Sequence, residues 1–147
     1  MADKNSAKVA EQLLHLMFLV HKKMMRPVIQ QSDLDLSPLQ VHVLDTLGEE
    51  KAATMTVLAN EVKMPKTQMT RIVDKLVSMG LVGREYDPSD RRIVKISLTD
   101  AGLVQLSHIK DEAIQKVGDK LAVLDGQMLS DLSAAATVMG EIVKRLP

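Results

Sequence analysis

The sequence has no cysteine among its 147 residues. Disulfides, thiolate metal ligands and cysteine-based redox sensing are therefore excluded. It also has no tryptophan, and its only aromatic side chains are Phe18 and Tyr86. Ten methionines, with leucine and valine, must fill the interior instead, which suits a helical protein. With 46% apolar residues, the chain is long enough for one domain with a hydrophobic core.

Net charge is absent as well, because 19 basic and 19 acidic residues cancel. The charge is unevenly distributed, however. Residues 63–95 hold eight Lys or Arg against four Asp or Glu, a local net charge of +4. Such a basic patch is an electrostatic footprint for phosphate, although most charged runs are only solvated faces.

No apolar run is long enough to cross a bilayer. The best candidate, around residues 13–20, contains His15 and follows Lys8 and Glu11. We expect no signal peptide, and therefore a soluble, cytoplasmic protein.

No pattern typical of an enzyme is present: there is no glycine-rich phosphate loop, and no Ser-His-Asp arrangement follows from the spacings. The four histidines are scattered, at His15, His21, His42 and His108. A metal site would have to assemble across helices. We expect a protein that is not an enzyme and has no metal or cofactor.

Residues 64–98 are the most informative stretch. Apolar residues at helical spacing predict a helix beginning near Lys66 with one buried face: Met69, Ile72 or Val73, Leu76 and Met79. Gly80 follows its last turn, where a left-handed C-cap is wanted, and Leu81 can pack back on it.

A β-hairpin is predicted next. Residues 81–86 form one strand, and Asp-Pro-Ser-Asp at 87–90 has turn chemistry. The return strand alternates apolar and polar side chains, with Val94, Ile96 and Leu98 on the buried face. A helix with a polar, cationic face suits the major groove, and a hairpin with Arg91 and Arg92 at its tip suits the backbone or a narrow minor groove.

At these residues the chain resembles the MarR family, bacterial and archaeal winged-helix regulators named for multiple antibiotic resistance. Residues 87–102, DPSDRRIVKISLTDAG, match the family's wing signature: Asp-x-Arg, a short strand, Leu-Thr and a nearby Gly. Residues 66–82 match its recognition helix and Gly-Leu-Val exit. The resemblance implies a mainly α fold with a small β-hairpin wing, a winged helix-turn-helix assembled as an intertwined homodimer. Relatives often have Ser or Asp where Pro65 stands, and Pro65 cannot cap a helix with its side chain.

The N-terminal elements follow from spacing and caps. We expect a helix over residues 6–30, bent or ended by Pro27, and then a polar connection over 31–36. Ser37-Pro38-Leu39-Gln40 is a capping box that opens a helix, which Gly48 stops.

In the remaining elements, residues 49–53 are predicted to be a loop, and Thr56 to cap a short helix. Thr99 caps a long helix with Asp100 at its positive end. A break at residues 125–126 precedes a last helix over 127–146.

Three regions of one compact domain are expected: an N-terminal dimerisation helix (1–36), the DNA-binding region (37–99) and C-terminal dimerisation helices (100–147). The outer helices hold more apolar surface than a small winged-helix core can cover. We prefer a homodimer to a helical core within one chain, because recognition of two half-sites also favours two-fold symmetry.

Candidate DNA contacts come from both parts of the stretch. In the helix, the candidates for base edges are Thr67, Gln68, Thr70 and Arg71, because Gln can pair with adenine and Arg with guanine. Lys66 and Lys75 are expected on phosphate. In the wing, the resemblance places Arg92 at the minor groove, braced by a salt bridge from Asp90, with Arg91 as the competing tip residue.

The function expected is a sequence-specific regulator of transcription, a repressor that binds a pseudo-palindromic double-stranded operator. The resemblance implies release by a small aromatic or phenolic effector. The candidate pocket residues are Phe18, His21, Met25 and His42, for which plain core packing is the competing interpretation. The alternative function is a winged-helix protein-interaction module without DNA binding; the cationic side chains of Arg71, Lys75, Arg91 and Arg92 argue against it.

Overall fold

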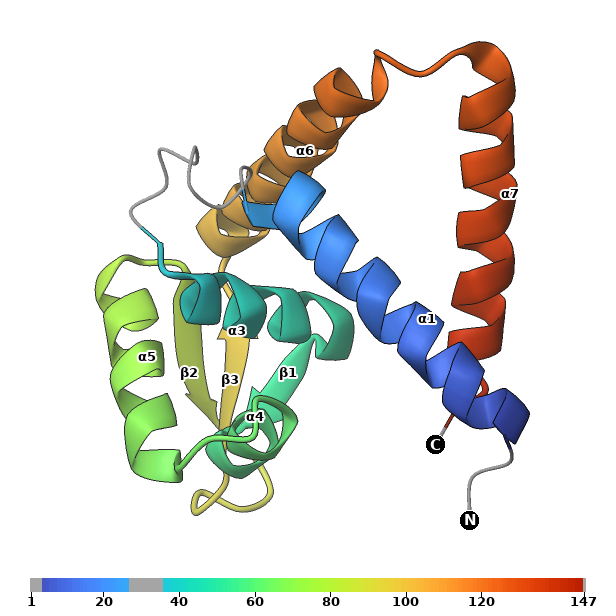
Figure 1. Ribbon diagram of the computed structural model, residues 1–147. Coiled ribbons are helices and arrows are strands. Elements are labelled where there is room, and N and C mark those ends of the chain that lie inside the picture. The colour runs from blue at the N-terminus through green and yellow to red at the C-terminus, as the bar shows by residue number, and fades with distance from the viewer. Residues whose placement is uncertain (1–3, 27–35, 147) are drawn as a thin grey trace. The chain divides into compact units, whose positions relative to one another are not determined.

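The computed structural model describes residues 4–26 and 36–146 (Figure 1). These residues form two compact units, one made of residues 4–26 with 113–146 and the other of residues 36–112. In the described parts of the chain, no helix is long and apolar enough to cross a membrane.

The unit of residues 36–112 is a three-stranded antiparallel sheet covered by helices, with strand order β1-β3-β2. Its elements are α3 (Pro38–Glu50), β1 (Ala52–Thr54), α4 (Met55–Glu61), α5 (Lys66–Ser78), β2 (Val82–Tyr86), β3 (Val94–Leu98) and the first half of α6 (Asp100–Leu121). Helices α4 and α5 form the helix-turn-helix, and β2 and β3 form the wing. The predicted helix, hairpin and return strand are all present.

The start of α3 confirms the capping box. The Ser37 hydroxyl accepts from the backbone N–H of Gln40 (3.3 Å), and the Gln40 side chain accepts from the N–H of Ser37 (2.7 Å). The predicted stop at Gly48 is wrong, because the helix continues to Glu50. A Cβ at Gly48 would lie 2.6 Å from the Leu106 side chain, so this glycine serves the close approach of α6 rather than the end of α3.

The predicted loop over residues 49–53 and the predicted Thr56 cap are both wrong, for one reason. Residues 52–54 form β1, in which Ala53 pairs with Ile96 of β3. This strand leaves Thr54 extended at the start of α4, where its side chain accepts from the N–H of Val57 (3.3 Å). A three-residue strand with two alanines carries too little alternation to be predicted.

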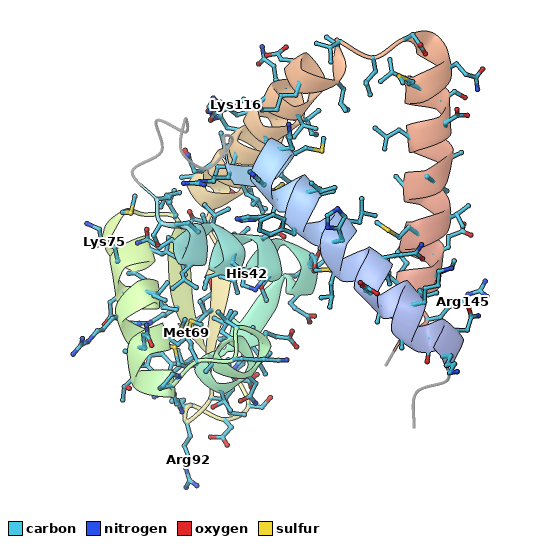
Figure 2. The ribbon with its side chains drawn as sticks, viewed as in Figure 1. His42, Met69, Lys75, Arg92, Lys116 and Arg145 are labelled. Carbon is cyan, nitrogen blue, oxygen red and sulfur yellow. The ribbon has the colours of Figure 1, made fainter. Side chains whose placement is uncertain are left out.

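The core of this unit lies between the sheet and α3, α4 and α5. Its fully buried side chains are Val43, Leu44, Leu47, Leu58, Met69, Val73, Leu76 and Ile96. The apolar face predicted for α5 is therefore confirmed, with Val73 rather than Ile72 in the core. Figure 2 shows Met69 directed into the unit. Burying a side chain of this size contributes about 1.5–3 kcal/mol, so α5 is held by packing along its inner face.

The unit of residues 4–26 and 113–146 is helical. It contains α1 (Lys4–Val20), a π-helical turn, η1 (His21–Met25), the second half of α6, and α7 (Gly126–Val143). The predicted first helix thus changes winding at His21, while Pro27 and most of the 31–36 connection lie outside the described residues. Asp125 caps α7 by accepting from the N–H of Met128 (2.8 Å). Neither α1 nor α7 has a buried residue.

Candidate nucleic-acid interface

Helix α5 begins without a side-chain cap, as Pro65 predicted. The Pro65 carbonyl instead accepts from the backbone N–H groups of Gln68 and Met69, both at 3.0 Å. The inner face of the helix is fixed in the core, so its outer face is presented to solvent. The side chains exposed there are Lys66, Thr67, Gln68, Arg71 and Lys75.

Thr70 differs from the other predicted base-contacting residues. It is half-buried, and its hydroxyl donates to the carbonyl of Lys66 one turn back (2.8 Å). That bond occupies its only proton, so Thr70 retains acceptor capacity alone. Thr67, Gln68 and Arg71 keep free donors on the exposed face.

An ion pair connects α5 to the wing. Asp74 on α5 lies 2.5 Å from the guanidinium of Arg84 on β2. The pair is partly exposed and so adds about 0–1 kcal/mol to stability. The pair also connects α5 directly to β2, the strand that leads to the wing tip. Neither residue was among the predicted site residues.

The cations of residues 63–95 divide into paired and unpaired ones. Ion pairs engage Arg84, with Asp74, and Lys95, with Asp87. Within this stretch, all of which is described, six others make no ion pair: Lys63, Lys66, Arg71, Lys75, Arg91 and Arg92. The positive charge that remains for a partner therefore lies on α5, the turn before it and the wing tip.

Asp87 organises the turn of the wing. One carboxylate oxygen accepts from the backbone N–H groups of Ser89 (2.9 Å) and Asp90 (3.3 Å), and the other pairs with Lys95 across the hairpin (2.7 Å). The hydrogen bond from Lys95, followed by that from Ser89, lowers the pKa of Asp87 below its ordinary value. The sequence indicated the turn but not the Lys95 partner, which depends on the strand register.

Asp90 braces the wing tip differently from the prediction. Its carboxylate accepts from the backbone N–H of Arg92 (2.9 Å), and its carbonyl accepts from the N–H of Ile93 (2.9 Å). Within the hairpin, all of which is described, no salt bridge joins Asp90 to the guanidinium of Arg92. The predicted bridge is wrong because the tight turn brings backbone, not side chain, to the carboxylate. Figure 2 shows the Arg92 side chain extended away from the hairpin.

Thr99 connects the wing to the helices around it. Its hydroxyl donates to the carbonyl of Gly80 (2.6 Å) and accepts from the N–H of Gly102 (3.0 Å), so the predicted cap is confirmed. Its backbone N–H donates to the carbonyl of Leu81 (3.1 Å). Gly80 has a φ of 73°, as its predicted left-handed position requires. This junction sets where β2 leaves the end of α5.

The predicted effector residues lie in two different units. Phe18, His21 and Met25 belong to α1 and η1, and His42 lies on α3. His21 and Met25 line an apolar hollow of about 220 Å³ with Leu13, Leu16, Met17, Val20 and Met139, whereas Phe18 is exposed and does not line it. The effector site stays a prediction. Among the described residues, no group of three His, Asp or Glu side chains is placed to hold a metal ion.

The comparison with known proteins decides the family. The sequence model of the MarR family matches residues 36–94. An uncharacterized HTH-type transcriptional regulator of Mycobacterium leprae is 30% identical over 117 residues, which cover 80% of this chain and 80% of that protein. This chain belongs to the MarR family. The resemblance identified from the recognition helix and the wing is thus confirmed.

The chain is also similar to a repressor in sequence and to two solved structures in fold. The HTH-type transcriptional repressor MdtR of Bacillus subtilis is 23% identical over 108 residues, covering 74% of this chain and 68% of that one. A cysteine-to-serine variant of MarR from E. coli has a TM-score of 0.74 at 25% identity, over 86% of this chain and 95% of that chain. A MepR mutant of S. aureus bound to an oligodeoxyribonucleotide has a TM-score of 0.69 at 19% identity, over 89% and 97%. The predicted winged helix-turn-helix fold is confirmed.

Proposed function

We propose that this MarR-family chain is a sequence-specific transcriptional regulator that binds double-stranded DNA, and that it is not an enzyme. One observation carries the proposal. The unpaired cations lie on the exposed face of α5, on the turn before it and on the wing tip. In Figure 1, α5 begins at the end of its unit where the β2–β3 turn lies. One surface therefore offers a helix for the major groove and a basic hairpin beside it.

The DNA contact proposed for each side chain follows from its unused hydrogen-bond donors and unpaired charge. Thr67, Gln68 and Arg71 approach base edges, because they stand in the first turns of α5 with unused donors. Thr70 serves only as an acceptor there. Lys66 and Lys75 bind phosphate and set the position of the helix without carrying sequence information.

At the wing, Arg91 and Arg92 bind the backbone or the adjacent minor groove. Asp87 and Asp90 hold the turn through backbone hydrogen bonds, so the tip is ordered before DNA arrives. This preorganisation reduces the entropic cost of binding.

The protein acts as a homodimer in this proposal. Residues 1–36 and 100–147 supply the dimer contact, and residues 37–99 supply the DNA contact. Support comes from the exposed apolar side chains of α1 and α7, among them Phe18, Leu132 and Ile142. A second copy would cover them, and the two-fold axis would demand a pseudo-palindromic operator.

Repression and release by a small aromatic or phenolic effector complete the proposal, with the protein in the cytoplasm beside its DNA. The relative MdtR is named a repressor. The candidate effector residues are Phe18, His21, Met25 and His42. An effector acts only if it prefers the arrangement that does not bind DNA.

The test is selection followed by quantitative binding. Purified protein selects duplexes from a random library, and the selected duplex, a scrambled duplex and the DNA flanking its own gene are compared in gel shifts. We expect tight binding to the selected duplex and weaker, salt-sensitive binding to the scrambled one. Absence of binding to every duplex at low salt would favour the alternative, a protein-interaction module without DNA binding.

A further inference from the structure

Tyr86 is a large aromatic side chain left exposed beside the proposed DNA-binding surface. It is the only tyrosine in the chain, ends strand β2 and is 70% exposed. Its hydroxyl makes no hydrogen bond within residues 4–26 and 36–146. Scattered exposed apolar residues are ordinary, so exposure alone assigns no role to it.

The strand register decides which way Tyr86 points. Side chains alternate along a strand, so Val82, Arg84 and Tyr86 lie on one face of β2. Val82 on that face is buried in the core, and Arg84 contacts Asp74 of α5. Tyr86 therefore points to the side of the hairpin that faces the recognition helix.

The position of Tyr86 along the axis of α5 follows from the ion pair between Asp74 and Arg84. Strand β2 runs back along α5, since it leaves the C-terminal end of the helix through Gly80 and the wing turn lies at the end where α5 begins (Figure 1). Two strand residues beyond Arg84 correspond to about 7 Å, or about four to five residues of helix. Counting back from Asp74 places Tyr86 level with Met69 and Thr70, in the first turns of α5.

A strand of the DNA backbone must pass this position. If α5 occupies the major groove and the wing tip the adjacent minor groove, the phosphates that separate the two grooves lie between them. Tyr86 stands between α5 and the tip, with a free phenolic O–H. Tyrosine is among the side chains that donate to phosphate oxygens in protein–DNA complexes.

We propose that Tyr86 binds DNA by donating its hydroxyl to a phosphate of the strand between the two grooves. This inference rests on the proposed function. Tyr86 is a neutral contact beside the cationic ones, so its removal should affect the salt dependence of DNA binding differently from the removal of a lysine or arginine. Removal of the hydroxyl weakens binding to every sequence, because phosphate carries no sequence information. It leaves the salt dependence unchanged, because no counterion is released by a neutral group.

The experiment compares the wild type with Tyr86→Phe, which keeps the ring and removes the hydroxyl. Ser107→Ala is the matched control, since it removes one exposed hydroxyl outside α5 and the hairpin. Affinity is measured on a duplex selected by the wild type and on a scrambled duplex, over a salt series. We expect Tyr86→Phe to bind both duplexes about 2- to 10-fold more weakly with the wild-type salt slope, and Ser107→Ala to match the wild type.

A second readout uses the single tyrosine directly. Protein grown with 3-fluorotyrosine carries one fluorine label, at position 86. Its ¹⁹F resonance should shift when the selected duplex is added. An unmoved resonance with unchanged affinity of Tyr86→Phe, while the wild type binds DNA, would overturn this inference and leave the proposed function intact. A loss confined to the selected duplex would overturn the phosphate assignment, and a wild type that binds no duplex would overturn both proposals.

Discussion

Asp74 and Arg84 form the one ion pair that joins the recognition helix α5 to strand β2 of the wing, at 2.5 Å, in the described part of the chain. Both side chains remain partly exposed, so the pair is a weak source of stability. Its position matters more, because it fixes the helix and the wing relative to each other. The two elements proposed to contact DNA should bind most tightly when they are held at the spacing of the grooves.

We predict that breaking this pair lowers DNA affinity more than stability. Asp74→Asn and Arg84→Gln should each change the free energy of unfolding by less than about 1 kcal/mol. Binding to the selected duplex should weaken in both, with a coupling energy of about 0.5 kcal/mol or more in a double-mutant cycle of dissociation constants. Strictly additive effects on binding would show that the pair does not position the wing.

The turn of the wing should lose its order at low pH, when the carboxylate of Asp87 becomes protonated. Because its pKa is depressed in the folded protein, the order it provides is present above its ordinary value of 3.8 and disappears as the pH falls through the lowered pKa. We expect an NMR titration of this carboxyl to have its midpoint below 3.8 and to move up toward that value in Lys95→Gln, which removes the largest cause of the shift. A wild-type midpoint at or above 3.8 would contradict the hydrogen-bonded turn.

Two glycines of α6, one closely packed and one in open space, test the packing between α6 and the start of the wing. A Cβ at Gly102 would lie 2.0 Å from the carbonyl oxygen of Leu81, whereas a Cβ at Gly118 would meet nothing within 4 Å. Gly102→Ala should therefore destabilise the protein by about 1–3 kcal/mol. Gly118→Ala should stabilise it by about 0.5–1 kcal/mol, because alanine favours helix. Urea unfolding measures both, and equal effects at the two sites would refute the close approach at Gly102.

Much of the unit of residues 36–112 was predictable from sequence because its signals are local. The capping box at Ser37, the left-handed Gly80 and the Thr99 cap each depend on residues a few positions apart. The apolar period of α5 likewise fixed its buried face. Strand β1 was missed because only its pairing with β3, some forty residues later, makes it a strand.

The residue types of the candidate interface could be predicted from the sequence, but the ion pairs and hydrogen bonds among them could not. Charge and spacing single out Arg71, Arg91 and Arg92 as candidate contacts. The pairing of Asp87 with Lys95 needs the hairpin register, and that of Asp74 with Arg84 needs the packing of α5 on β2. Asp90 was placed correctly at the tip, but its bond to the backbone of Arg92 could not be distinguished from a side-chain bridge by sequence.

The proposed dimer predicts that the C-terminal helix is essential for assembly. Helix α7 has no buried residue, and its exposed side chains include Leu132 and Ile142. A chain without residues 127–147 should be monomeric or aggregated in sedimentation velocity, while the full chain should be a dimer in dilute solution. A truncated chain that stays dimeric and binds DNA fully would contradict this role.

The most direct test of the central claim, that α5 and the wing contact DNA in different ways, compares Arg71→Ala with Arg92→Ala. Both side chains are exposed and make no ion pair within residues 63–95, so neither change should disturb folding. The binding of each mutant dimer to selected and scrambled duplexes is measured over a salt series. Arg71→Ala should cost about 1–3 kcal/mol and relax the preference at one base pair per half-site.

Arg92→Ala should instead weaken binding to most sequences and lower the salt slope by about one unit for each phosphate that the arginine no longer neutralises. Asp90→Ala should act in the same direction more weakly, because its carboxylate holds the backbone of Arg92. If Arg92→Ala left both the affinity and the salt slope at wild-type values, the wing would not contact DNA, and the account would be contradicted.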